Sequence, residues 1–148
     1  MPLSRLLLAA PDPRAVALHQ AFLTRQGFDV AVCGDGLGCV ERLRRDAPDL
    51  LVLSLDLPWG RGEGVLALMA DGELPLVPVL LLTDRPYSPR LAAIGRLSVR
   101  SYLSWPAPPR LLGRAIREAL ADVAIGHPSP EMDLPANEWA AAGPQPTA

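Results

Sequence analysis

The sequence predicts an α/β fold, a doubly wound parallel sheet of five strands with helices on both faces. Short apolar runs alternate with amphipathic stretches along the chain. The apolar runs cover residues 6–9, 28–32, 50–53, 77–82 and 99–103. Runs of this length that are apolar on both faces are typical of strands buried between two layers of helices. Strands that alternate with helices pair in parallel through right-handed crossovers, which accounts for the predicted sheet.

Helices are expected after each of these strands. Four stretches place apolar residues at helical spacing, and the weakest pattern, the fifth, lies between Ser88 and Leu97. The apolar positions are Ala15, Leu18 and Phe22; Leu37, Val40 and Leu43; Val65, Leu68 and Met69; and Leu111, Leu112, Ala115, Ile116, Ala119, Leu120 and Val123. Asp12 and Pro13 form an N-cap and first helical residue, and Gly27 follows the first helix as a C-terminal glycine.

Composition alone excludes several classes of function. The chain has 148 residues, 49% hydrophobic and 20% charged, with a formal net charge of -2. All 14 basic residues are Arg, so Schiff-base chemistry and a Walker-type phosphate lysine are excluded. The charge balance favours neither nucleic acid nor a membrane surface as a partner. No apolar run is long enough for a membrane span or a signal peptide, so a cytoplasmic protein is expected.

The cysteines and histidines do not predict a metal or redox site. Cys33 and Cys39 match neither a CxxC pair nor a zinc knuckle, and His19 lies far from His127 in the sequence. Both cysteines are expected to be small buried hydrophobic residues. No cofactor, metal or catalytic residue is expected.

The chain divides at about residue 123. Residues 1–123 are expected to form one domain, whereas residues 124–148 hold five of the 17 prolines, three acids and no Arg. This composition predicts a disordered acidic tail. Trp139 in the tail is either part of that disorder or an anchor for a partner.

Several stretches resemble the receiver domain of bacterial two-component response regulators. They are residues 5–13, residues 48–58 followed by Gly62, residues 79–83 and residues 102–106. The spacing between the stretches also matches the family, over most of residues 3–123. The resemblance implies a flavodoxin-like fold with strand order 2-1-3-4-5, a role in signalling, and a site at the carboxyl ends of the strands.

The residues at that site depart from the family pattern. The family uses an acidic pair that holds Mg²⁺, an aspartate that accepts a phosphoryl group, a Thr or Ser, and a Lys. The acidic pair falls on Ala10 and Pro11, the aspartate on Ser54 and the Lys on Trp105, while Thr83 keeps the expected type. The degenerate site thus comprises Ala10, Pro11, Asp12, Ser54, Asp56, Thr83 and Trp105. Without the acids and the cation, the charge of a phosphoryl group cannot be neutralised.

The interpretation is a receiver-like domain that is not an enzyme, is not phosphorylated and acts as a constitutive protein–protein interaction module. Tyr102 occupies the position of the family's switch aromatic. The expected interaction face is formed by the fourth helix, fifth strand and fifth helix in one fixed state, and it binds a protein partner or a second copy of the chain. Its candidate residues are Arg90, Arg96, Arg100, Tyr102, Arg114 and Arg117.

Two alternatives remain open. The vacated site could bind a small neutral molecule, since ligands favour this end of parallel sheets. Asp56 or Asp12 could instead serve as a phosphoacceptor; the simpler interpretation is a surface carboxylate and a helix cap. The bond between Trp105 and Pro106 is expected to be cis, with the indole folded over the vacated site.

Overall fold

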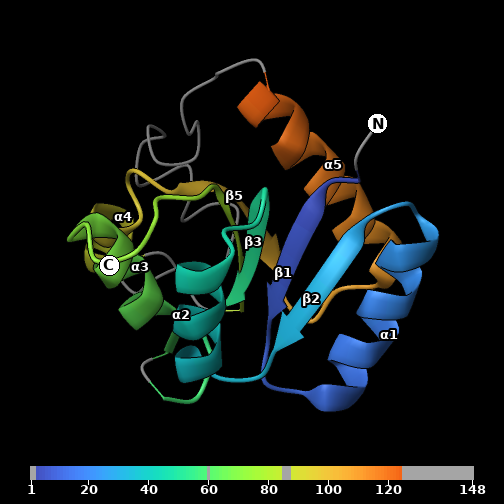
Figure 1. Ribbon diagram of the computed structural model, residues 1–148, viewed down its shortest axis with the longest axis horizontal. Coiled ribbons are helices and arrows are strands. Elements are labelled where there is room, and N and C mark those ends of the chain that lie inside the picture. The colour runs from blue at the N-terminus through green and yellow to red at the C-terminus, as the bar shows by residue number, and fades with distance from the viewer. Residues whose placement is uncertain (1–2, 60, 85–87, 125–148) are drawn as a thin grey trace.

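In a computed structural model, the chain forms a single sheet between two layers of helices (Figure 1). The structure describes residues 3–59, 61–84 and 88–124. Strands and helices alternate along the chain as β1 (Arg5–Ala9), α1 (Pro13–Arg25), β2 (Asp29–Cys33), α2 (Gly36–Arg45), β3 (Leu50–Ser54), α3 (Arg61–Ala70), β4 (Val79–Thr83), α4 (Pro89–Ile94), β5 (Val99–Ser104) and α5 (Pro109–Ala124).

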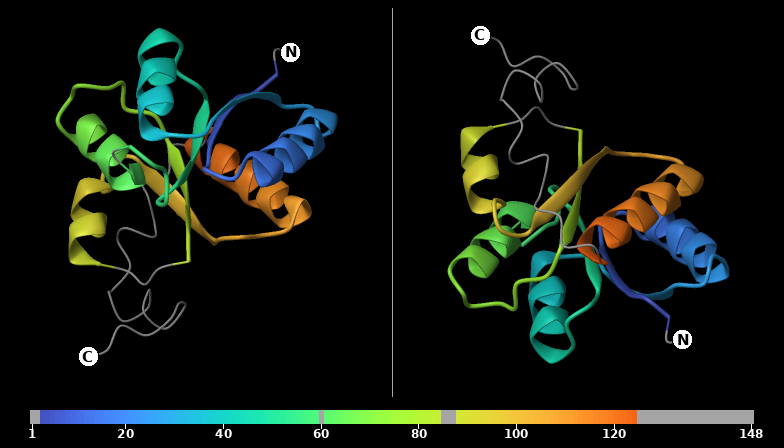
Figure 2. Two further views of the ribbon diagram at one scale, coloured as in Figure 1. Left: turned by 90° about the horizontal axis from the view of Figure 1, so that it is seen from below. Right: turned by 90° about the horizontal axis from the view of Figure 1, so that it is seen from above.

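The five strands are all parallel and lie in the order β2-β1-β3-β4-β5. The predicted fold class and strand order are confirmed. Helices α1 and α5 cover one face of the sheet, and α2, α3 and α4 cover the other (Figure 2). Because the strands run in one direction, the carboxyl ends of β1, β3, β4 and β5 meet at one edge, where the predicted site lies.

Two apolar layers form the core, one on each face of the sheet. Leu7 and Ala9 of β1 belong to the layer under α2, α3 and α4, whereas Leu6 and Leu8 belong to the layer under α1 and α5. Every residue of β3 and β4 is buried. Each of these strands is apolar up to its last residue, Ser54 or Thr83, because a central strand covered on both sides has no solvent face.

The buried face of α1 differs from the predicted one. The prediction placed Ala15, Leu18 and Phe22 on the apolar stripe, but Leu18 is 58% exposed. The helix instead buries Val16, His19 and Leu23. This stripe has the predicted spacing but is displaced by one residue, and it was missed because the imidazole of His19 was not counted as a core side chain.

A similar correction applies to α2. Leu37 was expected on the buried stripe but is 66% exposed, because it lies in the first turn, whose inward position is taken by Gly36. Gly36 donates its N–H to the carbonyl of Pro58 at 2.7 Å, and a Cβ at this position would collide with the carbonyl of Trp59. The close approach between α2 and the β3–α3 loop therefore requires glycine.

The two cysteines lie together beside β2. Cys39 is fully buried as expected, but Cys33 is only half-buried. A hydrogen bond with Cys33, together with burial, raises the pKa of the Cys39 thiol. The predicted stripe of α5 is confirmed at Leu112, Ile116 and Ala119, which are buried.

The predicted tail, residues 124–148 with Trp139, lies outside the described residues except for Ala124, the last residue of α5. No helix within the described ranges is both long enough and apolar enough to cross a membrane.

Gly62 offers a direct test of how tightly the β3–α3 loop is packed. A Cβ on Gly62 would lie 2.6 Å from the carbonyl oxygen of Ser54 and 2.9 Å from Cα of Leu55, backbone atoms that cannot rotate away. We expect Gly62→Ala to lower the free energy of unfolding by about 1–3 kcal/mol, measured by denaturant titration. Gly64→Ala is the matched control, because a Cβ there meets nothing within 4 Å. Equal stability of the two variants would contradict the packing described.

Candidate functional site

The carboxyl end of β1 carries no metal-binding acid pair. Ala10, which directly follows the strand, is buried, and Pro11 is exposed. Asp12 is exposed and caps α1, since its Oδ1 accepts a hydrogen bond from the N–H of Arg14 at 3.0 Å. The helix cap therefore accounts for the one carboxylate at this strand end.

Ser54, the last residue of β3, holds the central position of the edge. Its side chain is 1% exposed, and its Oγ accepts a hydrogen bond from the backbone N–H of Asp56 at 3.1 Å. The hydroxyl thus stabilises the turn that begins the β3–α3 loop. Asp56 itself is exposed and lies beyond the end of the strand.

The ends of β4 and β5 are joined beside Ser54. Thr83 ends β4 and is buried, and its carbonyl accepts a hydrogen bond from the N–H of Trp105 at 3.3 Å. The bond between Trp105 and Pro106 is cis, as expected. The structure therefore brings the predicted residues of all four strand ends to one edge.

The indole of Trp105 packs against α1. Its ring lies 4.9 Å from the ring of His19, measured between centroids and tilted by 41°, and the half-buried indole contacts the apolar layer under α1 and α5. We expected the indole to fold over the vacated site; its described ring contact is instead with His19. The position of the family's lysine is thus taken by an aromatic contact between the β5–α5 loop and α1.

His19 is a buried titratable group that the sequence analysis did not place in the core. It is 3% exposed, and nothing in the described part of the chain hydrogen-bonds to its Nδ1. Burial lowers the pKa of the imidazole, because a charged ring would be poorly solvated. The signal that could have found it is its position three residues after Val16 and four before Leu23.

Ala10, Ser54, Thr83 and Trp105, the residues at or directly after the four strand ends, are neutral. Across residues 3–59, 61–84 and 88–124, no three His, Cys, Asp or Glu side chains lie close enough to hold a metal ion. What converges here is a methyl group, two hydroxyl-bearing residues and an indole. Three surface hollows that the described residues form are lined by residues other than Ala10, Ser54, Thr83 and Trp105.

The structure divides the predicted interaction face. Arg90 and Arg96 are exposed around α4, whereas Arg100 and Tyr102 on β5 are half-buried, Tyr102 against the layer under α2, α3 and α4. Arg117 on α5 does not join this face. Its Nη1 donates a hydrogen bond to Oε1 of Gln26 on α1 at 3.4 Å.

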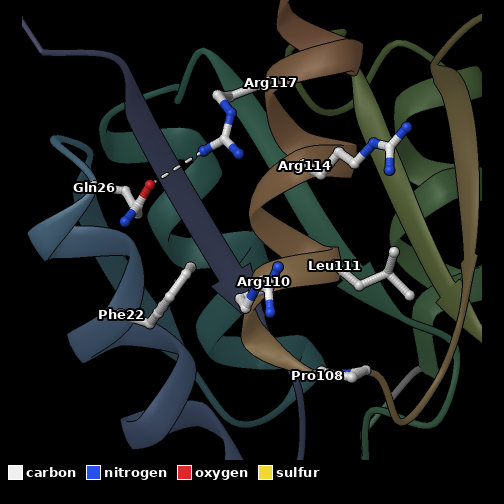
Figure 3. Close-up of a pocket in the computed structure, with 7 residues that line it drawn as sticks. All are labelled: Phe22, Gln26, Pro108, Arg110, Leu111, Arg114 and Arg117. Atoms are coloured by element: carbon white, nitrogen blue, oxygen red, sulfur yellow. Dashed lines mark hydrogen bonds between the residues drawn. The ribbon is translucent and has the colours of Figure 1, made fainter.

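Arg114, also on α5, is exposed and pairs with Glu118 at 3.4 Å. Arg114 and Arg117 both line an open groove between α1 and α5 (Figure 3). The sequence analysis assigned them to the face of α4 because it could not show which side of α5 each arginine covers.

The chain matches no protein-family model. It is 29% identical over 130 residues to the alkaline phosphatase synthesis transcriptional regulatory protein PhoP of Bacillus subtilis, covering 86% of this chain and 53% of that protein. It is 37% identical over 81 residues to the DNA-binding response regulator MtrA of Mycolicibacterium smegmatis, covering 54% of this chain and 36% of that protein. The chain thus spans between about a third and a half of the length of these relatives.

Solved receiver domains share the fold. A CheY-like receiver domain from Methanospirillum hungatei superposes with a TM-score of 0.71 at 20% identity, covering 82% of this chain and 96% of that one. A second match is the receiver domain of a sensor histidine kinase from Pseudomonas aeruginosa, which holds magnesium in its active-site cleft. It superposes with a TM-score of 0.68 at 21% identity, covering 81% of this chain and 99% of that one. Fold and sequence similarity together support a receiver domain of the response-regulator type.

The burial of His19 predicts that acid destabilises the fold. The unfolded chain takes up a proton at the ordinary histidine pKa of about 6.5, whereas the folded chain, whose His19 pKa is lowered, does so only at lower pH. Unfolding therefore binds a proton in this window, and the free energy of unfolding falls as the pH drops below about 6.5.

We expect His19→Phe, which keeps a ring against Trp105, to flatten this pH dependence in thermal denaturation measured between about pH 7 and pH 5. Leu18→Phe, at an exposed position of the same helix, is the control and should leave the slope unchanged. An unaltered slope in His19→Phe would show that His19 is not responsible.

Proposed function

We propose that this receiver domain is not phosphorylated and acts as a constitutive protein-interaction module, not as an enzyme. The observation that carries the proposal is the state of Ser54. At the position where the resemblance expects the phosphoacceptor carboxylate, the chain has a buried hydroxyl whose Oγ already accepts the N–H of Asp56. A neutral hydroxyl held in a turn is a poor nucleophile toward phosphorus without an adjacent base.

The surroundings of Ser54 support the same proposal. Mg²⁺ prefers carboxylate oxygens and water as ligands, and the residues at the acid-pair position are Ala10 and Pro11. Asp12 is engaged as the cap of α1. The position of the cation holds Trp105, which packs on His19. The acid pair and the cation that a phosphoryl group requires are both missing. The chain therefore has no buried charge at these positions without an opposite charge beside it.

In a module that is not phosphorylated, no phosphoryl group is present to shift the equilibrium between two conformations. A ligand can shift a conformational equilibrium only through its different affinities for the two states. We therefore assign the interaction surface to a fixed face made by α4, β5 and α5, on which Arg90 and Arg96 are exposed. Arginine is enriched among residues that dominate binding energy at protein interfaces. A second copy of the chain as the partner stays a prediction.

The alternatives predict different chemistry. Phosphorylation of Asp56 would require its exposed carboxylate to act outside the strand end, away from the Ser54 position. The small-molecule alternative would require a hollow bounded by Ala10, Ser54, Thr83 and Trp105, with a neutral ligand bound in it.

We expect the protein to bind neither Mg²⁺ nor beryllofluoride, an analogue of the phosphoryl group, in calorimetric titration. Incubation with acetyl phosphate and Mg²⁺ should leave its intact mass unchanged, because no carboxylate lies at the strand end of β3. A receiver domain that retains its aspartate serves as the positive control. Stoichiometric beryllofluoride binding, or a phosphoryl adduct that disappears in Asp56→Asn, would overturn the proposal.

A further inference from the structure

An open groove of about 680 Å³ lies between α1 and α5, on the face of the sheet opposite α4. It runs along the outer side of α5 (Figure 3). Its lining residues are Phe22, Gln26, Pro108, Arg110, Leu111, Arg114 and Arg117. The function proposed above makes no use of it.

The groove carries positive charge that the described carboxylates neutralise only in part. Arg110, Arg114 and Arg117 follow one side of α5 at a spacing of four and three residues, and all three are exposed. Arg114 has the exposed Glu118 as its partner, a type of pair that contributes little. Arg117 donates to a neutral amide, and no carboxylate of the described ranges pairs with Arg110.

The stability of α5 does not explain Arg110. Arg110 is the second residue of the helix, and the first turn contains no acid. Cations near a helix N-terminus are opposed by the helix dipole, typically by about 0.3–1 kcal/mol each. Because the helix dipole disfavours a cation at this position, a negatively charged ligand better explains the presence of Arg110.

The apolar part of the groove specifies the ligand further. Phe22 is half-buried at its side and Leu111 is 46% exposed. Gly113 lets α1 approach, because a Cβ there would lie only 3.3 Å from Cε1 of Phe22. Arginines beside an aromatic ring and an exposed leucine suit a peptide with several carboxylates and a large apolar side chain.

We propose that the groove binds the acidic C-terminal segment of the same chain, residues 125–148. This segment contains Glu131, Asp133 and Glu138, no basic residue other than His127, and Trp139 directly after the last acid. Three carboxylates thus match three arginines, and the indole supplies the apolar side chain. The docked segment would cover a surface that otherwise remains available to a partner.

Chain length permits this contact. Arg117 lies seven residues before the end of α5, about 10 Å along a helix that rises 1.5 Å per residue. Glu131 follows Ala124 by seven residues, which can span up to about 23 Å when extended. The first acid can therefore reach Arg117, and the later acids can reach Arg114 and Arg110.

The absence of lysine from the sequence provides a sharp test with the full-length chain. Arg110→Lys and Arg117→Lys each keep the positive charge and add the single side-chain amine, which a carbodiimide joins to any carboxylate in contact. We expect each variant to give a cross-link to Glu131, Asp133 or Glu138, identified by peptide mass mapping. Arg44→Lys, exposed on α2 on the other face of the sheet, is the matched control and should give none to the segment.

The cross-link should be lost when Glu131, Asp133 and Glu138 are replaced by Gln, Asn and Gln, and it should weaken severalfold as ionic strength rises. Cross-links confined to Glu118 or Asp122 of α5 would overturn the proposal, as would equal cross-linking in Arg44→Lys. Cross-links found only in covalent dimers would overturn it in favour of a second copy as occupant. The readout involves neither Mg²⁺ nor phosphoryl transfer, so its failure is distinct from failure of the proposed function.

Discussion

The burial of β3 and β4 on both faces is the constraint on which the rest of the structure depends. Each residue of these two strands is buried, so helices must cover both sides of the sheet. Helical crossovers in turn keep all strands parallel. Parallel strands bring Ala10, Ser54, Thr83 and Trp105 to one edge, although they lie far apart in the sequence.

Ala10, Ser54, Thr83 and Trp105 form a neutral set at this edge. In a buried ion pair, loss of one partner typically costs about 3–5 kcal/mol because the other charge stays unpaired. Where the resemblance places the acid pair, the acceptor carboxylate and the cation, this chain has Ala10, Pro11, Ser54 and Trp105. The replacements also take part in local structure, Ser54 through the N–H of Asp56 and Trp105 through the ring of His19. The hydrogen bond to Ser54 and the ring contact of Trp105 thus contribute to the stability of the fold.

Much of the fold could be predicted from the sequence, because short apolar runs that alternate with helical patterns are typical of buried parallel strands. All five predicted runs overlap strands of the structure. The predicted buried face of α1 was wrong by one residue, because His19 is a polar residue that is buried. The predicted burial of Leu37 was wrong because Gly36 takes the inward position of α2. The site positions came from the resemblance to receiver domains, whose pattern places them at the strand ends. The contact of Trp105 with His19 and of Arg117 with Gln26 could not be predicted, since each joins segments that are distant in sequence.

The central claim is that this chain is not phosphorylated because it lacks the charged side chains that a phosphoryl group requires. Restoring those side chains tests the claim most directly. Intact mass would be measured after incubation with acetyl phosphate and Mg²⁺, with folding checked by thermal denaturation. The account predicts that Ser54→Asp alone remains unmodified, because it lacks both metal ligands and cation, whereas the combined variant Ala10→Asp, Pro11→Asp, Ser54→Asp and Trp105→Lys gains one phosphoryl group on residue 54. Phosphorylation of the single variant to the same extent as the combined one would contradict it.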